Sequence, residues 1–204
     1  MSLAHITQVD QYSPSIWRER FTNADGDLEY TEVSGPSATA IIPEPTGPPR
    51  GVSIIAFSAD GTLLATVEQT RPNIAWIWTL GPESTPGIIS VLVHEHPVRQ
   101  IVWHPSMATL LLSNVNSTVA AVHCWSPQSQ PVVARVPVSR SESGKYDVRW
   151  LSLEQEYDLK FWFGTLEDYV LGCIEEKEGI PQFTTLYSVH SKVPSGSHGT
   201  SVGK

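Results

Sequence analysis

Short apolar runs separated by turn residues make up most of this chain. Between residues 51 and 190, β-branched and aromatic residues fall into twelve runs of four to seven residues, and Gly, Pro, Asn, Asp or Ser stands between them. Runs of this length and composition are typical of short β-strands. None of them keeps a 3.6-residue period over the length of a helix. The pattern predicts an all-β fold.

The twelve predicted strands group into three sets of four. Four short antiparallel strands are the composition of one β-propeller blade. The strands are expected at residues 53–57, 63–67, 74–78 and 87–93, then at 99–103, 110–113, 119–125 and 132–136, and finally at 147–151, 159–163, 168–174 and 183–189.

A fixed period links the three sets. Phe57, Trp103 and Trp150 stand at intervals of 46 and 47 residues, each at or near the end of the first strand of its set. Trp78 and Trp125, at the end of the third strand, are 47 residues apart. A period slightly above 45 residues is at the long end of the range for repeats that fold as propeller blades. The spacing predicts that each set is one copy of the same blade.

The repeated strings resemble WD repeats. FSADGTLLAT followed by IWTL is one such string, and HEHPVRQIVWHP leading to CWSP is another. The resemblance implies that His94, on the loop entering a blade, bonds Ser113 of the second strand and Trp125 of the third, with Asn116 in place of the usual turn acid. The remaining structural blade positions are Trp78, Trp103 and Trp150. The WD dipeptide itself is replaced by Trp-Thr and Trp-Ser, so the repeats are degenerate.

A narrower resemblance covers about residues 48–174. An Arg-Pro-Asn turn at 71–73 precedes the W-x-W strand of Trp76 and Trp78, and the later motifs PVRQIVWHP and HCWSP follow it. These motifs are similar to the last blades of a WD-repeat family that sits at centrosomes and spindle pole bodies, in complex with a minus-end-directed kinesin. The resemblance implies a non-catalytic scaffold in spindle-pole organisation and microtubule minus-end anchoring, located in the cytoplasm at the cytoskeleton. A WD-repeat adaptor of another complex, such as a ubiquitin-ligase substrate receptor or a translation-factor-like propeller, is the alternative.

The repeats divide the chain into parts. Residues 1–50 are interpreted as a Pro-rich linker region with one strand at 29–33 left from a preceding blade, residues 51–93, 94–137 and 146–190 as the three blades, and residues 191–204 as a disordered tail. Propellers typically close with about 4–8 blades, so three blades predict an incomplete ring. We expect self-association through the open blade edges, with apolar side chains exposed on the outer faces at Ile54, Ile77, Phe161 and Phe163.

Composition excludes several classes of partner. Among 204 residues, 21 Asp and Glu against 13 Lys and Arg give a net charge of -8. This balance argues against binding nucleic acid or an anionic membrane, because both need clustered cations. No apolar run approaches the length of a membrane span. The two cysteines, Cys124 and Cys173, form no disulfide framework, and a reducing compartment is expected.

The histidines of the second repeat are the candidates for chemistry. They are His94, His96, His104 and His123, with Cys124 beside them. Alternate residues on a strand or loop do not by themselves build a tetrahedral metal site, and no H-E-x-x-H, C-x-x-C, G-x-S-x-G or phosphate-binding Gly loop is present. The sequence therefore predicts no metal, no cofactor and no enzymatic activity.

Overall fold

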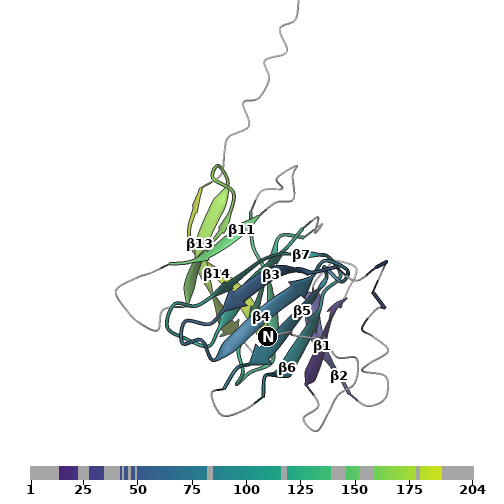
Figure 1. The fold of residues 1–204 in the computed structure, drawn as a ribbon. Coiled ribbons are helices and arrows are strands. Elements are labelled where there is room, and N and C mark those ends of the chain that lie inside the picture. The colour runs from purple at the N-terminus through teal and green to yellow at the C-terminus, as the bar shows by residue number, and fades with distance from the viewer. Residues whose placement is uncertain are drawn as a thin grey trace, which may run out of the picture.

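The structure is a computed structural model, and it contains only strands, turns and loops in the parts of the chain that it describes. These parts are residues 14–22, 28–34, 42, 44–45, 47–48, 50–81, 85–115, 119–138, 146–151, 159–177 and 180–189. They form fourteen strands in three sheets (Figure 1). No helix in these parts is long and apolar enough to cross a membrane.

The first sheet has six strands in the order β2-β1-β6-β5-β4-β3, which Figure 1 shows side by side. Its members are β1 (Ser15–Phe21), β2 (Leu28–Val33), β3 (Val52–Phe57), β4 (Leu63–Glu68), β5 (Ile74–Thr79) and β6 (Gly87–Val93). The strands β3 to β6 are antiparallel neighbours in chain order. They make up the first blade.

The second and third sheets have four strands each. The second contains β7 (Val98–Trp103), β8 (Leu110–Asn114), β9 (Ala121–Trp125) and β10 (Val132–Arg135), and the third contains β11 (Asp147–Trp150), β12 (Lys160–Gly164), β13 (Tyr169–Lys177) and β14 (Ile180–Val189). Each is an antiparallel meander, as in a propeller blade. The all-β prediction of three four-stranded blades in an incomplete ring is confirmed.

The turn between β3 and β4 shows how the sequence makes a blade. Gly61 has φ of 71°, a left-handed conformation that costs a Gly residue little. The Asp60 carboxylate accepts hydrogen bonds from the Ser58 hydroxyl at 2.6 Å and from the Thr62 amide at 3.1 Å. These bonds lower the pKa of Asp60, that from Ser58 most strongly. The motif S-A-D-G-T therefore forms a closed turn.

An N-terminal hairpin extends the first blade. The strand β1 pairs parallel to β6, with Ser15 opposite Ser90 and Arg18 opposite Val93, and β2 pairs antiparallel to β1. Residues 29–33 form a strand, as predicted, and this strand pairs with β1 in a hairpin at the outer edge of the first blade. Contacts between β2 and β10 bring the hairpin against the second blade as well.

The blades stack in chain order, and two apolar cores lie between them. We call the side of a blade toward the preceding blade its rear face and the other side its front face. The rear faces carry large aromatic side chains, and the front faces carry smaller aliphatic ones. Between the first and second blades the front face supplies Ala65, Val67, Ala75 and Ile77, and the rear face supplies Trp103, Trp125, Leu110 and Leu112. Between the second and third blades the corresponding sets are Leu111, Val122 and Ala134 against Val148, Phe161 and Phe163.

The same hydrogen bond recurs between successive blades. Trp103 Nε1 donates to the Ala56 carbonyl at 2.9 Å, and Trp150 Nε1 donates to the Val102 carbonyl at 3.1 Å. In both cases the indole of a first strand reaches the backbone of the preceding first strand. An ion pair between Arg99 and Asp147, 2.7 Å long, adds a second link between the second and third blades.

The expected exposure of apolar residues on the outer faces was wrong. Ile77, Phe161 and Phe163 are buried between blades, and Ile54 is half-buried. The reason is strand alternation, because Ile77 points to the second blade while its neighbours point away. The exposed apolar residues of the first blade are Ile55 at 61% and Phe57 at 58%.

Candidate functional site

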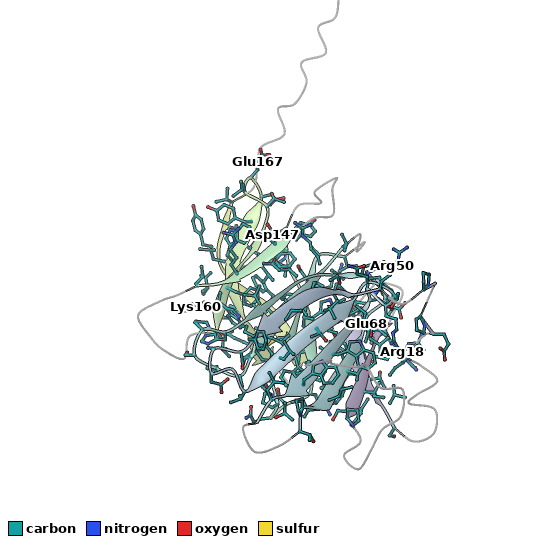
Figure 2. All side chains as sticks on the ribbon, viewed as in Figure 1. Arg18, Arg50, Glu68, Asp147, Lys160 and Glu167 are labelled. Atoms are coloured by element: carbon teal, nitrogen blue, oxygen red, sulfur yellow. The ribbon has the colours of Figure 1, made fainter. Side chains whose placement is uncertain are left out.

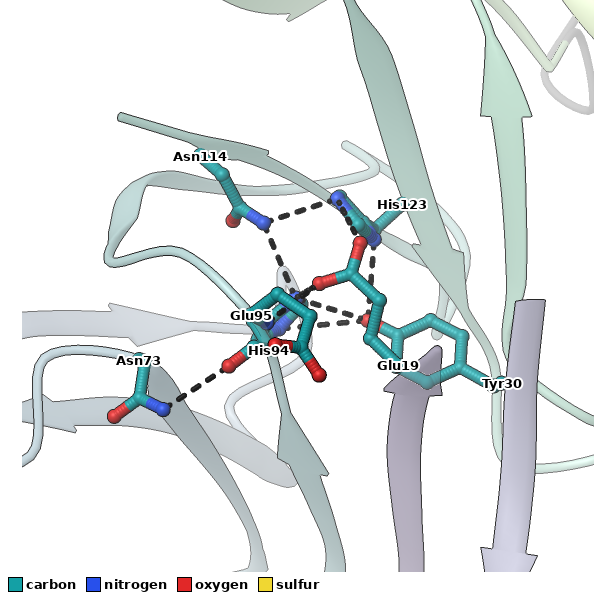
Figure 3. Close-up of polar contacts among 7 residues, drawn as sticks. All are labelled: Glu19, Tyr30, Asn73, His94, Glu95, Asn114 and His123. Carbon is teal, nitrogen blue, oxygen red and sulfur yellow. Dashed lines mark hydrogen bonds and ion pairs between the residues drawn. The ribbon is translucent and has the colours of Figure 1, made fainter. Parts of the chain in front are cut away.

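A buried polar cluster lies where the hairpin meets the first two blades (Figure 3). Its members come from β1, β2, the loop between β6 and β7, and the strands β8 and β9. Its carboxyl group and its two imidazoles are almost inaccessible to solvent, with exposures of 1–2%. The cluster consists of Glu19, Tyr30, His94, Asn114 and His123.

Tyr30 and Asn114 each contact both imidazoles. Tyr30 Oη is 3.2 Å from Nδ1 of His94 and 3.2 Å from Nδ1 of His123. Asn114 Nδ2 is 3.2 Å from Nε2 of His123 and 3.4 Å from Nδ1 of His94. The imidazole rings meet edge to face, with their centroids 4.8 Å apart. Asn114 Oδ1 is buried and has no hydrogen-bond partner among the described residues.

Glu19 enters the cluster through the parallel pairing of β1 with β6. The pairing ends at Arg18 and Val93, so the next residues, Glu19 of β1 and His94 just after β6, lie close together. Glu19 Oε2 accepts the backbone N–H of Glu95 at 2.8 Å and lies 3.7 Å from His94 Nδ1. Its other oxygen, Oε1, lies 3.6 Å from His123 Nε2. The carboxyl group therefore faces both histidines.

Burial favours the neutral form of Glu19, Tyr30, His94 and His123, and it is the largest cause of each pKa shift in the cluster. It raises the pKa of Glu19 to about 7, against the opposing effect of the Glu95 hydrogen bond. It lowers the pKa of His123 to about 3 and that of His94 well below its usual range. It also raises the pKa of Tyr30, with the Glu19 charge as a smaller cause. Both imidazoles are therefore neutral, which is the form in which histidine binds a metal ion.

The structure does not form the relay expected of His94. His94 lies on the loop entering the second blade, but it contacts Tyr30 and Asn114, not Ser113 or Trp125. Strand alternation is the reason. Leu110 and Trp125 are directly paired and share the rear face, so Ser113, three residues further along β8, points to the front face. Ser113 Oγ is buried without a partner in the described part of the chain. Asn116 lies outside the described residues.

In the first blade a third-strand indole bonds a second-strand hydroxyl directly. Trp78 Nε1 donates to Thr66 Oγ1 at 3.0 Å. Trp125, its counterpart in the second blade, donates to Ser90 Oγ of the first blade at 3.2 Å. The aromatic blade positions thus hold the stack together both within and between blades.

Of the metal-ligand candidates named from the sequence, His94 and His123 come together. His104 accepts hydrogen bonds from the backbone N–H groups of Ser106 and Met107 and packs edge to face on Trp150. Cys124 points into the core between the second and third blades, where burial raises its pKa to about 12. Cys124 and Cys173 form no disulfide in the described part of the chain.

Sequence reasoning missed Glu19 and Tyr30. Glu19 lies 75 residues before His94, and Tyr30 lies 93 residues before His123. The one local signal is the string SIWRERF, in which Glu19 shares a strand face with the apolar Trp17. The fold groups Glu19, His94 and His123 so that their ligand atoms all lie within 4.8 Å of one another, a set that could hold a metal ion.

A second notable surface is the rear face of the first blade, which has no blade before it in the described part of the chain. Trp76 and Trp78 lie on it with Leu64, and Ile42 packs against this cluster. The Arg71 guanidinium lies 5.2 Å from the centre of the Trp76 ring and forms a 2.7 Å ion pair with Glu68.

Four-stranded sheets stacked rear to front in chain order define this chain as an open array of β-propeller blades. Over 104 residues it is 31% identical to WD repeat-containing protein WRAP73 of Mus musculus, a match that covers 50% of this chain and 21% of that protein. This similarity supports a WD-repeat protein. The match spans about a fifth of the relative's length. No protein-family model matches the chain.

Solved propellers support the same fold. The chain superposes on the complex of KlAtg21 with the coiled coil of AgAtg16 with a TM-score of 0.51 and 13% identity, over 88% of this chain and 58% of that one. Kluyveromyces lactis Hsv2 gives a TM-score of 0.50 and 9% identity, over 68% of this chain and 48% of that one. The three blades thus correspond to about half of each of these structures.

Proposed function

We propose that this chain is a non-catalytic protein-interaction scaffold of the WD-repeat type, which acts in spindle-pole or centrosome organisation and in anchoring microtubule minus ends. Its partners are other proteins, including a minus-end-directed kinesin, and its place is the cytoplasm at the cytoskeleton. The spindle-pole role draws on the resemblance of residues 48–174 to the WD-repeat family found at those sites. The similarity to a WD repeat-containing protein supports the scaffold role.

The rear face of the first blade is the observation that carries a binding role. It has the same aromatic composition as the two rear faces that already pack against a neighbouring blade. Ile55 and Phe57 stand on β3 with more than half of their surface exposed. Exposed apolar residues beside a built aromatic face are typical of a protein-binding surface.

The buried cluster gives no support to catalysis. Glu19, His94 and His123 are 1–2% exposed, so a substrate could not reach them without opening the hairpin. The face to be tested is therefore the surface of β3 and not the cluster.

Affinity purification tests the proposal. The tagged chain is captured from dividing cells, and the bound proteins are identified by mass spectrometry, while a fluorescent fusion of the same chain is imaged in those cells. We expect spindle-pole components and a kinesin, and a focus at each pole. The double variant Ile55→Asp, Phe57→Asp should lose most of the bound protein.

Leu166→Asp is the matched control. Leu166 is 91% exposed beside Glu167, which Figure 2 shows at the outer tip of the hairpin joining β12 and β13. This control should bind like the wild type. Recovery of ubiquitin-ligase subunits or translation factors, with no enrichment at the poles, would replace the spindle-pole role with that of another adaptor.

A further inference from the structure

The geometry points to a structural zinc site formed by Glu19, His94, His123 and Asn114, which joins the N-terminal hairpin to the first two blades. The inference does not depend on the proposed function. It concerns how the hairpin is held, and it rests on the donor atoms that the fold gathers at one buried point.

The donor set fits zinc. Two imidazole nitrogens with oxygen donors suit Zn²⁺, which proteins bind tetrahedrally at about 2.0–2.1 Å. Such bonds place neighbouring ligand atoms about 3.3–3.4 Å apart. Glu19 Oε2 lies 3.7 Å from His94 Nδ1, Glu19 Oε1 lies 3.6 Å from His123 Nε2, and the ligand atoms of the three residues all lie within 4.8 Å of one another. Binding an ion draws the two imidazoles and one carboxylate oxygen closer together than they lie without it.

Asn114 supplies the fourth donor. Its side-chain amide lies 3.4 Å and 3.2 Å from the same two nitrogens that face Glu19. Its Oδ1 is buried and without a hydrogen-bond partner among the described residues. A half rotation of the amide brings this oxygen to the point where Nδ2 now lies and directs it at the ion. Asn114 Oδ1 then gains a partner in the metal ion, which offsets the cost of burying a carbonyl oxygen without a hydrogen bond.

Tyr30 contacts both imidazoles. If His94 binds through Nδ1 and His123 through Nε2, their other nitrogens each carry a hydrogen. Tyr30 Oη lies 3.2 Å from His123 Nδ1, and on His94 it lies 3.2 Å from Nδ1 and 3.4 Å from Nε2. With the ion on Nδ1 of His94, Tyr30 Oη can accept from Nε2 of His94 and from Nδ1 of His123. Metal-binding histidines generally donate their second N–H to a fixed acceptor of this kind.

The charges also favour an ion. Without one, a carboxyl group lies buried beside two neutral imidazoles, and ionising any of them there is costly. A divalent cation compensates the Glu19 carboxylate and uses the imidazoles in their neutral form. The ligands come from β1, β8, β9 and the loop after β6, so one ion ties the hairpin to both blades.

Metal analysis of the untagged full chain, purified without chelators, tests the site. We expect one zinc per chain by mass spectrometry, and a visible absorption spectrum of tetrahedral Co²⁺ after exchange. Chelation should lower the thermal midpoint, since metal binding stabilises the folded state. Zinc far below one per chain, with a midpoint that neither zinc nor chelator changes, would leave only a hydrogen-bonded network and overturn the site.

Two variants locate the metal. Glu19→Gln keeps the shape of the side chain but removes its charge, and it should abolish stoichiometric zinc. Tyr30→Phe should weaken zinc affinity by about 10–100-fold, as loss of an outer partner does. His96→Gln is the control, because His96 lies on the same loop and is not among the clustered ligands, so its zinc content should stay at one.

Zinc retained by a folded Glu19→Gln variant would place the ion elsewhere. If that variant does not fold, the Co²⁺ spectrum of the wild type decides the question.

Discussion

The junction between the first and second blades and the open rear face of the first blade use equivalent positions of one repeat. Trp103 closes the junction, where it is 9% exposed and donates to a carbonyl of the preceding blade. Phe57, its counterpart, is 58% exposed and has no side-chain N–H group to donate. The ability to pack against a neighbour is therefore built into each rear face. On the first blade Trp76 and Trp78 are buried, at 2% and 4% exposure, and the rear face stays exposed at β3, where Phe57 lies.

The two third-strand tryptophans show how the open face remains stable. Trp125 needs the preceding blade, because its indole N–H is satisfied by Ser90 of that blade. Trp78 is satisfied by Thr66 of its own blade. An unsatisfied buried N–H costs about 1–3 kcal/mol. The first blade thus carries a polar arrangement that works without a neighbour, whereas the second does not.

Truncating the junction tryptophans should have the largest effect. Trp103→Ala and Trp125→Ala each remove a buried aromatic side chain and its interblade hydrogen bond, and each should lower the free energy of unfolding by about 3–5 kcal/mol. Urea denaturation at equilibrium measures this. A loss below about 1 kcal/mol at both sites would contradict a packed junction.

A smaller effect is expected at Ser90, the acceptor for Trp125. Ser90→Ala leaves the indole N–H buried without a partner and should cost about 1–3 kcal/mol. Ser113→Ala is the matched control in the second blade, because its hydroxyl has no partner among the described residues, and its effect should lie within about 0.5 kcal/mol. Denaturant midpoints of both variants provide the comparison. Equal losses at the two serines would mean that Trp125 bonds within its own blade.

The ion pair between the second and third blades should contribute less. Arg99 and Asp147 have side chains 30% and 40% exposed, so solvent screens them. A double-mutant cycle with Arg99→Met and Asp147→Asn should give a coupling energy of about 0.2–1 kcal/mol that shrinks in high salt. A coupling that salt leaves unchanged would contradict a screened pair.

The smallest effect on folding is expected at the open face. Phe57→Lys should change the free energy of unfolding by within about 0.5 kcal/mol, because the side chain is exposed. The same change should reduce self-association of the isolated chain, which we expect to form oligomers through its unpaired blade faces. Light scattering coupled to size-exclusion chromatography measures both proteins. A wild-type chain that is a monodisperse monomer at every concentration would show that the exposed face of the first blade does not cause self-association.

The blades could be predicted from the sequence because a blade is a local structure. Each antiparallel strand pairs with the next one in the chain, so runs such as 74–78 and turns such as 59–61 carry enough information. The faces were harder to assign. Leu112 and Ser113 are neighbours on β8, and their side chains point to opposite faces of the blade. An error of one residue in register therefore places a side chain on the wrong face. The apolar runs alone do not fix such a register, so they predict neither the face of Ser113 nor that of Ile77.

The candidate site could not be predicted for a different reason. Its histidines lie in one repeat, but Glu19 and Tyr30 reach them only through the pairing of β1 with β6. That pairing is parallel, and the four strands from β2 to β5 lie between its two members in the chain. No local periodicity reports such a contact. The proposed spindle-pole role rests on scattered motifs and stays a prediction.

The parallel pairing of β1 with β6 also sets an order of events during synthesis. Ser15 pairs with Ser90, so 75 residues must be added after the first partner leaves the ribosome before the second does. At about 5–20 residues per second, that interval lasts roughly 4–15 s. Until then Ile16 and Trp17, buried in the finished protein, can pair with β2 but not with the first blade. The hairpin of β1 and β2 therefore waits, with apolar side chains uncovered, for a strand made seconds later.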